Sequence, residues 1–231
     1  MRRRPNRLGL RTRASRNSAA PFQCRLVVMA KVPVMGRVKT RLAREVGAVE
    51  AVRFFRHTVG TVLARVGRDR RWQTSLSVAP DTGIASPFWP RNSIRKRQGS
   101  GDLGQRMQRV MDEAGPGPVI IIGTDIPAIK TSHIARAFRL LRGADAVFGA
   151  APDGGYWLVG LRRSPRIRRP FMGVRWSTTT TLTDTTANLT GSHIAVADTL
   201  CDVDNAAELA VARNRFGRRI LPAADNQPKV L

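Results

Sequence analysis

Short apolar runs alternate along this chain with segments whose apolar residues recur every three or four positions. Residues 26–30, 75–79 and 119–122 read as strands, and residues 48–66 and 102–114 read as amphipathic helices. Because strands and helices alternate, we expect an α/β fold: a single Rossmann-like domain with a mainly parallel central sheet and helices on both faces.

The second half of the chain continues the pattern. Residues 132–141 predict a helix, and residues 144–151 and 156–161 predict strands separated by the turn-forming run Pro152-Asp153-Gly154-Gly155. A polar, threonine-rich helix is expected after residue 177. Residues 205–216 predict a final helix, which Asn205 could cap, with Glu208 placed three residues later as in a capping box.

A chain of 231 residues, 42% of them hydrophobic, can bury the core of one domain, and we place that domain at residues 25–220. Residues 1–24 are rich in Arg, Asn and Ser and poor in large apolar groups, which predicts a disordered basic tail. An organelle-targeting peptide or a wrongly chosen start codon would have a similar composition. Residues 221–231 are expected to form a loose end.

The formal charge of +24 comes from 40 basic and 16 acidic residues, so the surface should attract ligands that carry phosphate. A non-catalytic nucleic-acid-binding protein is one alternative, and a general drift of composition towards arginine, which needs no polyanionic partner, is another. The sequence has no recognised nucleic-acid-binding motif, and aromatic residues do not alternate with the basic ones of the tail. We therefore do not favour nucleic acid as the partner.

The cysteines indicate neither a zinc site nor a disulfide framework, because Cys24 and Cys201 lack a CxxC spacing or a nearby histidine. The apolar stretch 26–36 is too short to span a bilayer and contains Lys31 and Pro33. We expect a cytoplasmic protein without membrane contact. The sequence does not indicate the oligomeric state.

The loop after the first strand, AKVPVMGRVKTRL from Ala30, has the composition of a phosphate-binding loop. Gly36 permits close approach of the backbone, Lys39 and Arg41 are cationic donors, and a following helix would present free N–H groups to a di- or triphosphate. The loop is not a Walker A motif, because its glycine and lysine are not adjacent. A basic turn without a ligand is the alternative interpretation.

Residues 99–104 match the GxGxxG pattern of dinucleotide-binding folds, and Asp125 follows at a distance suitable for a ribose-binding carboxylate. In such a fold a buried strand precedes the glycines. Residues 93–98 are strongly charged, and we expect that they cannot lie in a parallel sheet covered on both faces. We therefore do not favour a dehydrogenase.

Two acidic patches lie far apart in the chain: Asp125 follows the apolar run 119–122, and Asp202 and Asp204 precede the last predicted helix. Taken singly, Asp125 could only stabilise a turn, and Asp202 or Asp204 could only cap a helix. If both patches end strands of one sheet, they meet at its carboxyl edge, where open α/β sheets bind ligands. Their oxygens would suit Mg²⁺ or Mn²⁺. We expect Asp125 and Asp204 to meet beside the basic loop and to hold a metal bridged to phosphate.

The segment Asp153-Gly154-Gly155-Tyr156-Trp157 combines a carboxylate, two small residues and aromatics that could stack on a sugar or base. An ordinary hairpin turn with core aromatics is the alternative. The histidines are scattered without ligand spacing, and we assign them no chemistry.

Six motifs in order, AKVPVMGRVKTRL, QGSGDLGQRM, IGTDIP, APDGGYWLVGL, GVRWS and DVDNAAEL, resemble a bacterial family of glycosyltransferase-A-fold proteins often labelled arsenosugar-biosynthesis-type glycosyltransferases. The resemblance runs from about residue 26 to residue 209 and implies the nucleotide-diphospho-sugar transferase superfamily. Two departures are visible. The first loop lacks the Gly-Gly-x-Ser/Thr-x-Arg-Met-Gly pattern of nucleotidyltransferases, and Thr124-Asp125-Ile126 replaces a compact DxD.

The resemblance implies a role for each matching residue. Lys39 would neutralise phosphate charge in catalysis, and Asp153 would orient the hydroxyl of the acceptor. The metal ligands would be Asp125 and Asp204, the nucleotide-binding residues Ala30, Lys31, Gly36, Lys39, Arg41, Asp102 and Arg106, and the acceptor-pocket residues Asp153, Gly154, Gly155, Trp157 and Trp176.

The interpretation that follows is a metal-dependent transferase that binds a nucleotide-activated sugar and passes the sugar to a small acceptor. The close alternative is guanylyl or cytidylyl transfer from an NTP to a phosphorylated small molecule, which would use the same metal and basic residues and release pyrophosphate.

Overall fold

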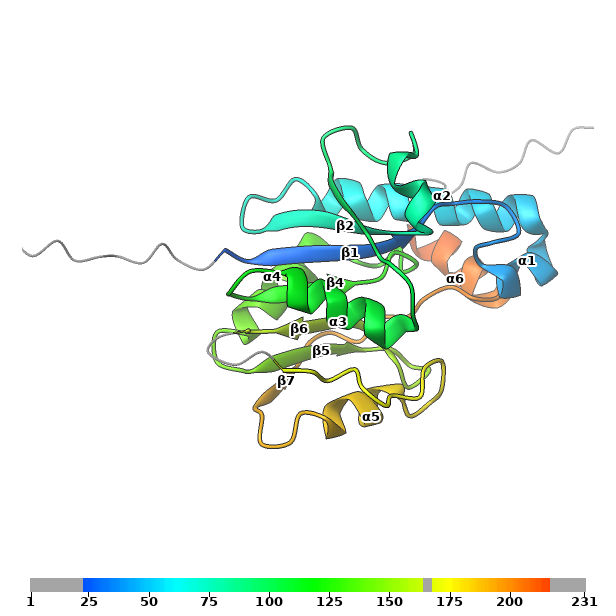
Figure 1. Ribbon diagram of the computed structural model, residues 1–231. Coiled ribbons are helices and arrows are strands. Elements are labelled where there is room, and N and C mark those ends of the chain that lie inside the picture. Colours follow the sequence, from blue (N-terminus) through cyan, green and yellow to red (C-terminus); the bar gives the residue numbers. More distant parts are fainter. Residues whose placement is uncertain (1–22, 164–167, 217–231) are drawn as a thin grey trace, which may run out of the picture.

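The computed structural model describes residues 23–163 and 168–216, and within them seven strands form one sheet in the order β3-β2-β1-β4-β6-β5-β7. Figure 1 shows this sheet with every strand except β3 labelled. The pairs β1–β2, β1–β4, β2–β3 and β5–β7 are parallel, whereas β6 runs antiparallel to β4 and β5. The predicted α/β fold with a mainly parallel sheet is confirmed. The strands are β1 (Arg25–Lys31), β2 (Gln73–Ala79), β3 (Ile94–Arg97), β4 (Val119–Ile122), β5 (Ala146–Ala150), β6 (Tyr156–Leu161) and β7 (Ile194–Val196).

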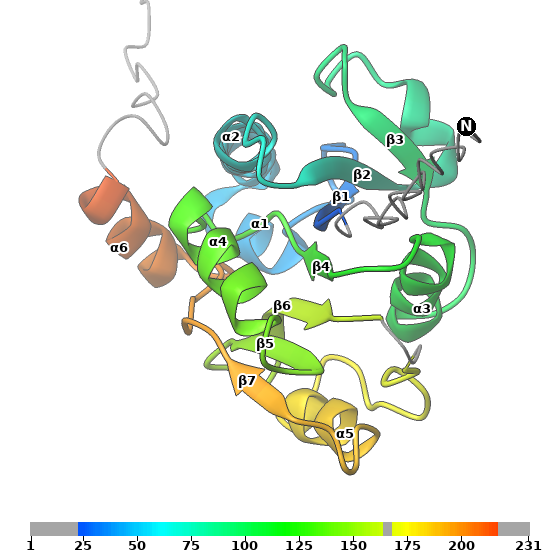
Figure 2. The same cartoon turned by 90° about the vertical axis from the view of Figure 1, so that its left-hand side faces the viewer.

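Helices cover both faces of the sheet (Figure 2). Leu26 and Val28 of β1 face a core built with α2 and α4, and Val27 between them faces a second core built with α3. This alternation follows from the two-residue period of a strand. The helices are α1 (Thr40–Val46), α2 (Ala48–Val66), α3 (Leu103–Glu113), α4 (Thr131–Leu140), α5 (Thr181–Ala187) and α6 (Ala206–Phe216), with the 3₁₀ helix η1 at Asp81–Ala85.

The helix ends use the signals that the sequence carries. Asp102 caps α3 by accepting a hydrogen bond from the Gln105 N–H at 2.8 Å, and the Gln105 side chain completes the capping box. Asn205 caps α6 as predicted, accepting from the Glu208 N–H at 2.9 Å. The Glu208 carboxylate, however, accepts from the N–H of Asp204 rather than from that of Asn205, so only half of the predicted capping box forms.

The charged segment 93–98 does enter the sheet, contrary to the expectation. It contributes β3, which pairs with β2 alone and leaves its basic side chains at an exposed edge, where no second sheet neighbour has to accommodate them. The GxGxxG run therefore follows a strand after all. Asp125 nevertheless follows β4, which is separated from β3 by β2 and β1, so it is not the ribose-binding carboxylate of a dinucleotide fold.

The domain limits at residues 25–220 stay a prediction. Residues 1–22 and 217–231, which hold most of the predicted tail and all of the predicted loose end, lie outside the described residues. Among the described residues, no helix is both long and apolar enough to cross a membrane.

Candidate active site

The loop between β1 and α1 brings Lys39 back to the edge of the sheet. The Arg37 N–H donates to the Val34 carbonyl at 3.1 Å, and Gly36, with φ of 75°, occupies the turn position that requires a positive φ. Val38 then packs into the core. Lys39 itself has φ of 47°, a left-handed conformation that is costly for a residue with a side chain, and it precedes the first turn of α1. This backbone directs the lysine side chain inward.

The Lys39 ammonium lies among carboxylates from distant parts of the chain. Its Nζ donates to Asp125 Oδ2 at 3.0 Å and to Asp204 Oδ1 at 2.8 Å, and it lies 3.9 Å from Asp202 Oδ2. The Lys39 side chain is only 5% exposed. Arg41 contacts the same cluster from the outside, with Nη1 at 3.4 Å from Asp204 Oδ2. The structure thus brings together Asp125, Asp204 and the basic loop, as the sequence predicts.

Topology explains half of this convergence. Strands β1 and β4 are parallel neighbours in register, so the loops that carry Lys39 and Asp125 leave the same edge of the sheet. Asp202 and Asp204 arrive differently. The expectation that they end a strand is wrong, because β7 ends at Val196 and residues 197–205 form neither strand nor helix. They are positioned instead by α6, whose first N–H, on Ala206, donates to Glu45 Oε2 of α1 at 2.8 Å.

Asp202 belongs to this cluster, although the site residues predicted from the sequence do not include it. Burial, partly offset by the Lys39 ammonium, raises the pKa of the Asp202 carboxyl to about 6, and the charges of Asp204 and Asp125 add to that rise. Burial alone would lower the pKa of Lys39, but the adjoining carboxylates outweigh it and raise that pKa. The signal was present in the sequence: in an extended Asp-Val-Asp segment the carboxylates share one side while buried Val203 points to the other.

The chemistry of the cluster fits a divalent cation. Asp125, Asp202 and Asp204 offer hard oxygen donors, which suit Mg²⁺ or Mn²⁺. Their spacing, however, is set by an ammonium, and within residues 23–163 and 168–216 no group of three or more His, Cys, Asp or Glu is arranged to hold a metal directly. The donors therefore fit a metal, whereas their present geometry is that of a lysine ion-pair cluster.

A cavity of about 340 Å³ opens beside Asp125 and Asp202. Leu103 and Met107 of α3 form one side of it, and residues 176–178 before α5 form another. Four of the five predicted acceptor-pocket residues line this cavity: Asp153, Gly155, Trp157 and Trp176.

Gly154 has a structural role in the turn beside the cavity. Its φ is 84°, and a Cβ there would lie 2.1 Å from the Thr179 carbonyl oxygen. Asp153 shapes the same turn, because its Oδ1 accepts from the Gly155 N–H at 2.9 Å. The turn is thereby packed against the segment that precedes α5.

The two tryptophans that were predicted to line the acceptor pocket differ in burial and in hydrogen bonding. Trp157 is buried, and its indole N–H donates to the Asp198 carbonyl at 2.8 Å. Trp176 is half-buried and packs on Gly104 so closely that a Cβ at Gly104 would lie 2.7 Å from the ring. Trp176 is therefore the aromatic that could contact a ligand without breaking a hydrogen bond.

The remaining predicted nucleotide-binding residues are more dispersed. Ala30 is buried in β1, and Lys31 is exposed at the end of that strand. The carboxylate of Asp102 is engaged in capping α3, and Arg106 Nε donates to the Gly101 carbonyl at 2.9 Å. Among these groups the structure thus shows helix-capping and loop-stabilising contacts, and their part in nucleotide binding stays a prediction.

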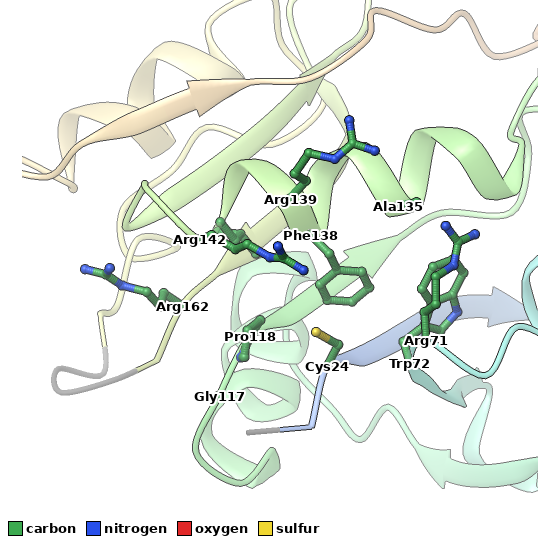
Figure 3. A pocket seen from close by; sticks show the side chains of 11 residues that line it. Cys24, Arg71, Trp72, Gly117, Pro118, Ala135, Phe138, Arg139, Arg142 and Arg162 are labelled. Carbon is green, nitrogen blue, oxygen red and sulfur yellow. The ribbon is translucent and has the colours of Figure 1, made fainter. Parts of the chain in front are cut away.

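A second cavity, of about 780 Å³, lies where β1 and β4 begin, at the opposite edge of the sheet (Figure 3). Trp72, Phe138 and Cys24 contribute to its apolar lining, and burial raises the pKa of the Cys24 thiol. Arginines stand around it, of which Arg162 is paired with Asp145 at 2.9 Å. None of the predicted site residues lines this cavity.

Solved structures share the fold. A candidate nucleotide-diphospho-sugar transferase from Desulfovibrio desulfuricans G20 is 28% identical, with a TM-score of 0.76 over 83% of this chain and 87% of that one. The 4-diphosphocytidyl-2C-methyl-D-erythritol synthase from Anaerococcus prevotii DSM 20548 is 10% identical, with a TM-score of 0.54 over 84% and 98% of the two chains. A CMP:2-keto-3-deoxy-manno-octonic acid synthetase solved with CTP is 13% identical, with a TM-score of 0.50 over 84% and 98%. The last two similarities concern the fold alone.

No curated protein matches the sequence significantly. Residues 62–178, half of the chain, match the family DUF2064, described as an uncharacterized protein conserved in bacteria. With the Desulfovibrio structure, this match confirms the predicted superfamily. The name of that structure agrees with the prediction of a transferase. The chain belongs to the DUF2064 family and has the fold of the nucleotide-diphospho-sugar transferases.

Proposed function

We propose that this protein is a cytoplasmic, metal-dependent glycosyltransferase that binds a nucleotide-activated sugar and transfers the sugar to a small acceptor. The observation that carries the proposal is the meeting of Asp125, Asp202 and Asp204 with Lys39 at the carboxyl edge of the sheet, beside a cavity. The similarity to the Desulfovibrio structure, whose name refers to a nucleotide-diphospho-sugar transferase, supports the same substrate class.

Each group of the cluster has a part in such a reaction. Sugar transfer leaves negative charge on the departing diphosphate, and cations held in fixed positions stabilise that charge. Lys39 and Arg41 supply such cations, and Asp125 and Asp204 would hold the Mg²⁺ or Mn²⁺. When bound, this ion supplies further charge stabilisation and orients the diphosphate.

The other proposed contacts lie around the cluster. The backbone at Ala30 and Gly36, with Lys31, would wrap the nucleotide, and Asp102 and Arg106 would adjoin it. Asp153, at the wall of the cavity, would orient the acceptor hydroxyl, with Trp176 providing a face for a sugar ring.

A thermal-shift panel of nucleotide sugars and NTPs, with and without Mn²⁺, tests the proposal. A ligand present at a hundred times its Kd stabilises the folded protein by about 2.7 kcal/mol. We expect at least one nucleotide sugar to raise the Tm in the presence of Mn²⁺. Asp125→Asn should abolish the rise. Asp69→Asn, whose carboxylate pairs with Arg71 on a surface loop, should preserve it.

Product analysis then separates the two transferase chemistries. Sugar transfer or slow hydrolysis of the donor releases a nucleotide, whereas nucleotidyl transfer from an NTP releases pyrophosphate. Pyrophosphate release with a phosphorylated substrate would replace the proposal by the alternative. A Tm that no nucleotide changes, with metal present, would contradict both.

A further inference from the structure

The most unusual feature of the site is that a cation of the chain itself occupies its centre. The Lys39 ammonium is within 3.0 Å of one oxygen of Asp125 and one oxygen of Asp204, and its side chain is almost completely buried. The inference that follows rests on the proposed function, because it concerns the metal that Asp125 and Asp204 would hold.

The oxygens that Lys39 uses are those that a metal would need. Asp204 directs its second oxygen to Arg41 at 3.4 Å. Asp125 directs its second oxygen back to its own loop, 3.3 Å from where a Cβ on Gly123 would lie. The remaining oxygens, Asp125 Oδ2 and Asp204 Oδ1, both point at the ammonium. A divalent ion shared by the two aspartates would therefore lie between these same atoms.

The two cations exclude each other there. Mg²⁺ binds its oxygen ligands at about 2.1 Å, so an ion between these carboxylates would take the space of the ammonium. Like charges a few ångströms apart also repel strongly in a partly buried site. We propose that the Lys39 ammonium is a displaceable internal counter-ion: it holds Asp125, Asp202 and Asp204 together when metal is absent, and a divalent cation must expel it to bind.

The charges of the cluster are consistent with the replacement of the Lys39 ammonium by a metal ion. Bringing Asp125, Asp202 and Asp204 within 4 Å of one point is costly unless a cation lies among them. Lys39 supplies that cation. Removing Lys39 from the carboxylates requires work that lowers the metal affinity, so the unmodified protein should bind free Mn²⁺ weakly.

Mn²⁺ binding to the full chain without nucleotide, followed by electron paramagnetic resonance, tests the inference. Lys39→Met keeps most of the length of the side chain and removes its charge. We expect this variant to bind Mn²⁺ about tenfold or more tightly than the unmodified protein, in the range of ordinary coupling between two sites. Arg37→Met is the matched control: it removes the same charge from an exposed position of the same loop, and it should change the affinity far less. Equal or weaker Mn²⁺ binding by Lys39→Met would overturn the inference.

A second measurement uses the unmodified protein and does not depend on the folding of a variant. Mg²⁺ should increase the rate at which acetic anhydride acetylates Lys39, detected by mass spectrometry, because the displaced amine becomes accessible. Lys96, which pairs with Glu113 on the surface, should react at an unchanged rate. An unchanged rate at Lys39 would contradict the inference.

The inference and the proposed function can fail separately. If the protein transfers sugar but its Lys39→Met variant gains no Mn²⁺ affinity, the proposed function holds and the displacement of Lys39 by a metal is contradicted. If that variant binds Mn²⁺ tightly but the unmodified protein responds to no nucleotide sugar, the displacement of Lys39 holds and the proposed function is contradicted.

Discussion

At the scale of single residues, the turn between β5 and β6 requires glycine at position 154. Its positive φ and the 2.1 Å separation between an added Cβ and the Thr179 carbonyl oxygen leave no room for a side chain. We expect Gly154→Ala to lower the free energy of unfolding by about 1–3 kcal/mol or more, because strain at such a position is of that size. Urea denaturation measures the change.

Gly143→Ala is the control for that substitution. Gly143 has open space around its Cα, so an added methyl group there meets no neighbouring atom. If Gly154→Ala were no more destabilising than Gly143→Ala, the result would contradict the tight packing of this turn against the segment before α5.

The sequence predicts only part of the cluster that Lys39 forms with the aspartates. Asp125 was predictable for the right reason, because it follows the buried strand β4 and so lies at the sheet edge, whereas Asp204 reaches the same place without ending a strand. Nothing in the sequence indicates that Lys39 lies between them. That depends on a left-handed φ at a non-glycine residue, which the amino-acid type disfavours and tertiary contacts impose.

At the scale of elements, the segment before α5 is held by an ion pair that gives it a pH dependence. Arg175 donates from Nε and Nη2 to the Asp184 carboxylate at 2.9 and 2.8 Å, and Asp184 also accepts the Arg175 backbone N–H at 3.1 Å. These bonds lower the pKa of Asp184 to about 2. The segment between the partners includes Trp176, at the wall of the cavity.

The sign of the effect follows from the lowered pKa. Above the ordinary aspartate value of 3.8 the carboxylate is ionised in both states and the pair stabilises the fold; the contribution disappears as the pH falls towards 2. We expect Asp184→Asn to lower the Tm at neutral pH, and the difference from the unmodified protein to shrink between about pH 4 and pH 2. A Tm difference that stays constant over this range would contradict the assignment.

The predictability of elements depended on length and burial. The periodicity of residues 48–66 gave α2 with the bounds that the structure shows, because a long amphipathic helix repeats its signal many times. By contrast, β3 is a charged edge strand and β7 has three residues. Neither offers the buried alternating pattern from which a strand is recognised.

At the scale of the whole molecule, the charge of +24 predicts general attraction to polyanions in addition to any specific site. We expect RNA to bind the protein at low ionic strength and to be released steeply as salt rises, since such binding depends on counter-ion release. A nucleotide sugar held by partly buried ion pairs should be less sensitive to salt. Parallel titrations of both ligands at increasing NaCl measure the contrast, and RNA binding that resists high salt would instead favour a nucleic-acid-binding function.

The hydrogen bond between Lys39 and Asp204 joins residues 165 positions apart in the sequence. A ribosome therefore has to release almost all of the ordered domain before the last carboxylate can reach the lysine. Until Asp204 has left the ribosome, the cluster of three carboxylates around Lys39 cannot be complete. Assembly of this site is consequently among the latest events in the maturation of the molecule, and it belongs to the long-range contacts that slow folding.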